Sequence, residues 1–201
     1  MTFFSFGAEQ NHGERDEENG ISVGRRDFLR FGLGAAVAGA LMSPEDALAA
    51  VRAPSRALHL QNLHTGEKAQ VEYWVKGQYV RSSLRMLDRV MRDHHNGDIH
   101  SMDPRLLDQI YLLTKTLGKR GPVQIISGYR SPETNAALRE EDGSGVAQNS
   151  YHMQGRAVDI RVPGMPLKQL RFAALRLKAG GVGYYPRSNF IHIDTGPIRR
   201  W

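Results

Sequence analysis

Residues 150–162 constrain the fold of this chain more than any other segment. They read Ser-Tyr-His-Met-Gln-Gly-Arg-Ala-Val-Asp-Ile-Arg-Val. Gly155 permits a turn, and the largely apolar run over 157–162 predicts a strand that begins directly after it. His152 therefore lies on a loop and Asp159 on a strand. With a turn between them, the two side chains can converge on one point.

A pair of strands is predicted near the end of the chain. Residues 182–185 and 190–194 are short apolar runs, and the segment between them, 186–189, is predicted to be a turn. His192 lies in the second run. Because side chains at positions i and i+2 share one face of a strand, Asp194 should face the same side of the sheet as His192.

The rest of the chain predicts a mixture of helices and strands. A hairpin is expected from strands at 58–63 and 71–75, joined by a turn. Asp103 is a suitable N-cap for a helix that starts with Pro104. Helices are predicted at 79–93, 104–117, 133–139 and 167–177, and a further strand at 123–126. This order predicts an α+β fold with a small, mainly antiparallel sheet and helices packed on one side.

Residues 1–49 have the layout of an export signal. After a polar start, Arg25 and Arg26 are followed by Asp-Phe-Leu, which resembles the twin-arginine motif. The apolar run over 31–42 is shorter than the roughly 20 residues that a spanning helix needs. Ala47-Leu48-Ala49 has the small-x-small pattern of a cleavage site. We therefore expect 50–201 to be the mature domain, exported to the periplasm by the twin-arginine machinery, without a membrane span.

Composition limits the available chemistry. The chain has no cysteine, so a metal site must use His, Asp or Glu, and no Cys nucleophile exists. The formal charge is +6, from 27 basic and 21 acidic residues; residues 1–49 hold four basic and eight acidic ones, which leaves 23 − 13 = +10 for the remainder. A basic domain suits an anionic partner such as nucleic acid, a membrane surface or an anionic cell wall, but the same charge can simply maintain solubility.

The two histidines and the carboxylate form a candidate metal site. His152, Asp159 and His192 make a three-ligand set with the fourth position open, as a catalytic zinc requires. Such a zinc lowers the pKa of a bound water and polarises a scissile carbonyl. Asp194 is the candidate for the carboxylate that accepts the proton of the water. It could instead orient a ligand imidazole, and both roles remain open.

The motifs resemble those of the M15-type zinc peptidases. The segments SGYRSPETN, SYHMQGRAVDI, GGVGYYP and FIHIDTGPIRRW are similar to the exported murein endopeptidase branch of that superfamily. The resemblance implies a fold like that of the D-Ala-D-Ala peptidases and the hedgehog domain. It also implies one zinc ion, held by His152, Asp159 and His192, and peptidoglycan peptide crosslinks as the substrate, with no nucleic-acid partner. By the same resemblance, Arg130 faces the substrate, where a guanidinium can grip a carboxylate or stabilise a developing anion.

One position departs from that pattern. Several relatives carry an acid three residues before the last zinc histidine, whereas this chain has Asn189, which cannot accept a proton. The base must then be Asp194 or a histidine. Two alternative functions follow: a D-alanyl carboxypeptidase, in which Arg130 holds the free carboxylate, and a non-catalytic zinc-containing domain that binds the cell wall. The pair His94-His95 is interpreted as capping a helix end or as surface.

Overall fold

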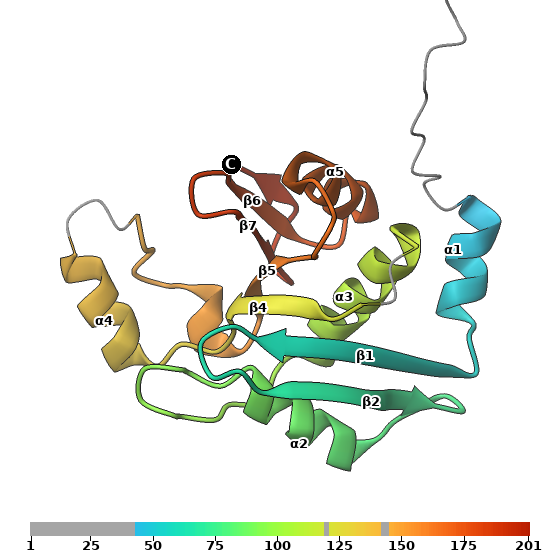
Figure 1. Ribbon diagram of the computed structural model, residues 1–201, viewed down its shortest axis with the longest axis horizontal. Coiled ribbons are helices and arrows are strands. Elements are labelled where there is room, and N and C mark those ends of the chain that lie inside the picture. The colour runs from blue at the N-terminus through green and yellow to red at the C-terminus, as the bar shows by residue number, and fades with distance from the viewer. Residues whose placement is uncertain (1–42, 119–120, 142–144) are drawn as a thin grey trace, which may run out of the picture. The chain divides into compact units, whose positions relative to one another are not determined.

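The computed structural model describes residues 43–118, 121–141 and 145–201 (Figure 1). The predicted twin-arginine motif and its apolar run lie outside these residues. The first described helix, α1 (Pro44–Val51), spans the predicted cleavage site. Within the described ranges, every helix is too short or too polar to cross a membrane.

The strands of the described chain form one sheet with the order β3-β2-β1-β4-β5-β7-β6-β8. Their bounds are β1 Ser55–Asn62, β2 Lys68–Val75, β3 Gln78–Tyr79, β4 Val123–Ser127, β5 Ala157–Arg161, β6 Gly181–Tyr185, β7 Phe190–Asp194 and β8 Arg199–Arg200. The predicted hairpin is β1 and β2, and the predicted strand pair near the end of the chain is β6 and β7. The α+β class is therefore confirmed.

The sheet is larger than predicted, and it is mixed. Five neighbouring pairs are antiparallel, but β1 lies parallel to β4 and β6 lies parallel to β8 in the described structure. The prediction of a small, mainly antiparallel sheet is thus only partly correct. Two helices separate β1 from β4 along the chain, and a long helical connection is what allows two strands to pair in parallel.

The helices fall close to their predicted positions. Their bounds are α2 Arg81–Val90, α3 Pro104–Thr116, α4 Pro132–Glu140 and α5 Leu167–Leu177. A 3₁₀ turn, η2 Tyr151–Gln154, takes the place of the loop predicted around His152. Helix α3 begins as expected, because the Asp103 carboxylate accepts a hydrogen bond from the backbone N–H of Arg105. Helix α2 is shorter than the predicted 79–93, since residues 78 and 79 pair with β2 instead.

Alternate residues of the central strands face opposite sides of the sheet. One set packs into a single apolar core with residues of α2, α3 and α5; it comprises Leu58, Leu60, Val123, Ile125, Val158, Ile160, Ile191 and Ile193. The residues between them on β5 and β7 include Asp159, His192 and Asp194, which point to the other side. The period of two thus separates an apolar face, which holds the fold together, from a polar face, which is free to carry a site.

Candidate metal centre

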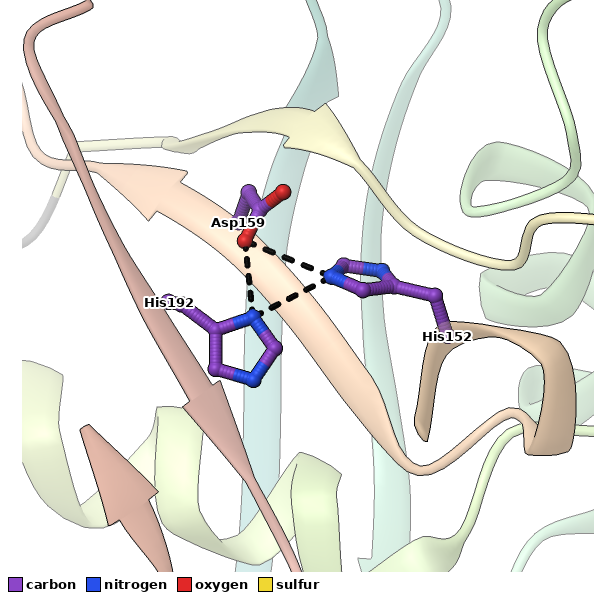
Figure 2. Close-up of side chains that lie close together, drawn as sticks. All are labelled: His152, Asp159 and His192. Atoms are coloured by element: carbon purple, nitrogen blue, oxygen red, sulfur yellow. Dashed lines mark hydrogen bonds and ion pairs between the residues drawn. The ribbon is translucent and has the colours of Figure 1, made fainter. Parts of the chain in front are cut away.

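Three side chains from separate elements converge on the polar face of the sheet, and we call them the triad (Figure 2). Asp159 comes from β5, His192 from β7 and His152 from η2. Asp159 and His192 are direct cross-strand partners. The Nδ1 atom of His192 lies 3.0 Å from Asp159 Oδ1 and 3.1 Å from His152 Nε2, and the remaining separation, from His152 Nε2 to Asp159 Oδ1, is 3.4 Å.

Local structure fixes the direction of His152. The Ser150 hydroxyl accepts a hydrogen bond from the backbone N–H of His152 and so caps η2. Gly155 ends the turn with a φ of 64°, a left-handed conformation that favours glycine. The Nδ1–H of the imidazole donates to the carbonyl of Gly128 at 2.7 Å. This bond assigns the proton to Nδ1 and leaves the lone pair of Nε2 facing the triad.

His192 is held in the complementary way. Its Nε2 lies 3.0 Å from Asp194 Oδ2, and the ionised carboxylate can only accept, so Nε2 carries the proton. The lone pair of Nδ1 then faces the triad. Gly183 is the cross-strand neighbour of His192 on β6. Because it has no side chain, the ring of Trp201 can pack against it, where an added Cβ would clash with that ring.

The donor set of the triad fits a zinc ion. Two imidazole nitrogens and a carboxylate oxygen face one another, and when both rings are neutral their lone pairs meet at a point where a cation would be stabilised. Their separations of 3.0 to 3.4 Å are close to the edge of a tetrahedron, which is about 3.3–3.6 Å for zinc bonds of about 2.0–2.2 Å. Burial alone would raise the pKa of Asp159, but the two imidazoles outweigh it and hold that pKa well below its usual range. The carboxylate is therefore ionised, as a ligand must be.

Asp194 lies behind His192 rather than beside the triad. Its side chain is 0% exposed. Burial would raise its pKa, but hydrogen bonds from His192, Arg199 and the backbone amides of Gly196 and Gly181 lower it below the usual range. Asp194 is also absent from the residues that line the adjoining cavity. It contacts the imidazole nitrogen that points away from the triad.

A cavity of about 340 Å³ opens beside the triad. It is lined by all three triad residues and, among others, by Arg130, Tyr151, Tyr185, Phe190, Arg199 and Trp201. Asp159 is the only acid among the described residues of this lining.

Arg130 points its charge into this cavity. Its guanidinium makes only long contacts of 3.4 Å, to Asn135 Oδ1 and Ser127 Oγ, and no carboxylate of the described chain lies within ion-pair distance. Burial lowers its pKa. A partly buried guanidinium without a fixed anion is suited to bind an anionic group of a ligand.

Asn189 serves the turn between β6 and β7. Its φ is 53°, a left-handed value that asparagine tolerates better than most residues. Its backbone N–H donates to the carbonyl of Pro186. It is exposed and does not line the cavity, so its side chain lies apart from the triad.

Sequence reasoning missed three participants in this site. The Gly128 carbonyl could not be foreseen, because backbone groups leave no trace in a motif. Arg199 and Trp201 were not among the predicted site residues, yet Arg199 pairs with Asp194 and the Trp201 ring lies 5.2 Å from that of His192. Asp194 could have indicated a role for Arg199, because a buried carboxylate requires a cation or several hydrogen-bond donors nearby.

Comparisons with known proteins identify the family to which this chain is similar. A family model described as peptidoglycan L,D-endopeptidase MepK matches residues 50–201. The peptidoglycan L,D-endopeptidase MepK of Escherichia coli K12 is 49% identical over 182 residues, which cover 90% of this chain and 98% of that protein. The probable peptidoglycan L,D-endopeptidase MepK of Haemophilus influenzae is 41% identical over 185 residues, which cover 91% and 98% respectively.

Proposed function

This chain belongs to the peptidoglycan L,D-endopeptidase family of M15-type peptidases, and from that premise we propose that it is a zinc-dependent murein endopeptidase. It hydrolyses peptide crosslinks of peptidoglycan. The relatives are named for bonds between an L- and a D-configured centre, and we propose the same class of bond for this chain. One zinc ion per chain is held by His152, Asp159 and His192.

The observation that carries the proposal is the orientation of the triad. Each imidazole uses one nitrogen to bind a fixed acceptor, Gly128 O or Asp194 Oδ2, and turns the other toward Asp159. Such partners of metal-binding histidines raise their basicity and restrict their rotation. A bound zinc ion supplies a water ligand of lowered pKa and an electrophile for the scissile carbonyl.

The other polar groups have distinct roles in this proposal. Arg130 binds a substrate carboxylate or the oxygen that becomes negative during attack, since it lines the cavity and lacks a fixed anion. Of the two roles open to Asp194, we propose the orienting one. Its buried carboxylate contacts the His192 nitrogen opposite the one that faces the triad and does not line the cavity, which suits a fixed acceptor better than a proton shuttle.

Digestion of intact sacculi tests the function. The purified protein is incubated with sacculi with and without a chelator, and the muropeptides are separated by chromatography. Loss of crosslinked muropeptides only when zinc is present is the expected result. Loss of terminal D-alanine with the crosslinks unchanged would instead identify a carboxypeptidase. Absence of any product would favour a non-catalytic zinc-containing domain.

We also propose that residues 1–49 are a twin-arginine signal and that 50–201 form the mature periplasmic peptidase. The start of the family match at residue 50 supports this boundary. Replacing Arg25 and Arg26 with lysine should retain the unprocessed precursor in the cytoplasm. Cell fractionation and N-terminal sequencing of the periplasmic form check both parts, and a mature start far from residue 50 would contradict the boundary.

A further inference from the structure

We infer that Arg199 is a positioning residue for the metal centre, which holds Asp194 so that His192 presents Nδ1 to zinc. The inference rests on the proposed zinc site and adds a residue to it. The three side chains form a chain of contacts from Arg199 through Asp194 to His192.

Five donors surround the buried carboxylate of Asp194. Its Oδ1 accepts from the backbone N–H groups of Gly181 at 3.1 Å and Gly196 at 2.8 Å, and from Arg199 Nη1 at 3.1 Å. Its Oδ2 accepts from Arg199 Nη2 at 2.7 Å and from His192 Nε2 at 3.0 Å. Arg199 thus binds both oxygens at once, which fixes the plane of the carboxylate as well as its charge.

Arg199 also contacts the segment that carries His152. Its guanidinium lies over the ring of Tyr151, 5.2 Å from the centroid, and over the ring of Trp201 at 4.9 Å. Tyr151 directly precedes His152 in η2. One guanidinium therefore links the element of one ligand to the orienting partner of another. A planar fork can pair with a carboxylate and stack on aromatic rings together, which the point charge of a lysine cannot do.

Glycines make this close packing possible. A Cβ added at Gly181 would lie 2.6 Å from both Arg199 Nη1 and Asp194 Oδ2. A Cβ at Gly196 would lie 2.6 Å from the ring of Tyr151. These positions have room for the guanidinium, the carboxylate and the ring only because a side chain is missing. Gly181 of the motif GGVGYYP thus leaves space for Asp194 and Arg199, which orient His192.

The test measures zinc affinity by competition with a chromogenic chelator. Arg199→Ala should bind zinc about 10- to 100-fold more weakly than the wild type, and Arg199→Lys should recover part of the loss because it restores the charge without the fork. Arg200→Ala is the matched control, because Arg200 is the exposed neighbour on the same strand. It should bind zinc like the wild type.

A double-mutant cycle separates positioning from a general loss of stability. If Arg199 acts through Asp194, adding Arg199→Ala to Asp194→Asn should lower zinc affinity little further. Unchanged affinity in Arg199→Ala, or effects that add fully, would overturn the inference. Failure of the wild type itself to bind zinc would instead refute the proposed metal site, so the two failures can be told apart.

A second cavity carries a second proposal, which rests on the proposed endopeptidase function. It has a volume of about 280 Å³ and is lined in part by His64, His94 and His95, which we call the histidine stack. It shares Arg130 and Asp159 with the cavity beside the triad. We propose that the two cavities are the two arms of one substrate groove, because the substrate of an endopeptidase extends to both sides of the bond that is cut.

The arms differ in charge. Among the described residues, Arg130 lines both cavities, but the cavity beside the triad adds Arg199, whereas the second adds imidazoles together with Asp93 and Glu141. Burial and the neighbouring imidazoles lower the pKa of His94 to about 4, so its ring is neutral at pH 7. The carboxylate-bearing arm of the crosslinked peptide then fits the arginine side. The arm that presents amide or amino groups fits the histidine stack.

Steady-state kinetics on a purified crosslinked muropeptide dimer test this assignment. His94→Ala should raise KM about tenfold, a loss near 1.4 kcal/mol, while kcat and zinc content stay unchanged. His59→Ala is the control, because His59 lies on β1 and does not line either cavity. An unchanged KM, or a loss of zinc in His94→Ala, would overturn the proposal, whereas an inactive wild type would refute the proposed function.

Discussion

Two groups of histidines lie on this molecule, and they differ in what holds their rings. In the triad, each imidazole has a second nitrogen bonded to a backbone carbonyl or a buried carboxylate. In the histidine stack, the rings contact one another face to face or tilted, with centroids 3.8 Å apart for His64 and His94 and 4.2 Å apart for His94 and His95. Within the described structure, no ring nitrogen of the stack donates or accepts a hydrogen bond to a fixed partner.

The carboxylates differ in the same sense. Asp159 turns an oxygen toward both triad histidines. Asp93, next to the histidine stack, uses its oxygens to accept from the backbone N–H groups of His95 and Ser131. Of the described residues, only the triad gathers three ligand atoms within metal-binding range. The number of imidazoles is thus a poor guide to a metal site, and the orientation of each ring decides.

The largest effect should come from the triad carboxylate. Asp159→Asn keeps the shape of the side chain but replaces a charged zinc ligand with a neutral amide. We expect zinc to be lost on purification and hydrolysis of sacculi to fall below detection. Metal analysis of the variant checks this. His95→Ala, a variant of the histidine stack, is the control and should retain zinc. Equal zinc contents in the two variants would contradict the assignment of the metal site to the triad.

Arg130 lies between the two groups and lines both cavities. Arg130→Ala should lower kcat/KM by about 10²- to 10³-fold, as expected for the loss of a group that stabilises a developing anion. Zinc content should not change, because the guanidinium binds no triad residue. Kinetics on a crosslinked dimer, together with metal analysis, check the prediction. A variant that loses zinc as well would show that Arg130 supports the metal rather than the substrate.

Substitution of Asp194 should lower activity less than the preceding changes, and added zinc should restore the activity. Asp194→Asn weakens the partner of His192, so zinc affinity should fall about 10- to 100-fold. Excess zinc should then restore most of the activity. If Asp194 were the proton acceptor, the variant would stay inactive even when fully loaded with zinc. A titration of activity against zinc concentration therefore decides between its two possible roles.

The smallest effect should be a pH dependence that originates in the histidine stack. His94 has an ordinary pKa of 6.5, and the fold lowers it to about 4, so the unfolded chain binds this proton more readily. Protonation of His94 does not affect the free energy of unfolding above pH 6.5, and it lowers that free energy as the pH drops from 6.5 toward 4. The thermal unfolding temperature of the wild type should therefore fall more between pH 6.5 and pH 4 than that of His94→Gln. Parallel curves would contradict the lowered pKa.

Much of the fold could be predicted because its signals are local. The N-cap Asp103 with Pro104 marks the start of α3, and short apolar runs mark the strands. What failed was non-local. The parallel pairing of β1 with β4 depends on how two intervening helices pack, which no single segment specifies. His94 and His95 were expected to cap a helix or lie at the surface. His95 is exposed as expected, but α2 ends at Val90 and His94 is half-buried, with its ring stacked on that of His64.

The sequence by itself determined the residue types of the triad and the side of the sheet to which they point. The spacing of His152 and Asp159 around Gly155 and the period of two along the strands are local properties. Only the tertiary structure decided which nitrogen of each ring faces the ligands. The partner of His152 is Gly128, 24 residues away, which no local pattern indicates. The partner of His192 is Asp194, two residues on, and Arg199 reaches Asp194 from a separate strand. A motif can therefore identify the ligand residues of a metal site, but the surrounding tertiary contacts determine how their side chains are oriented.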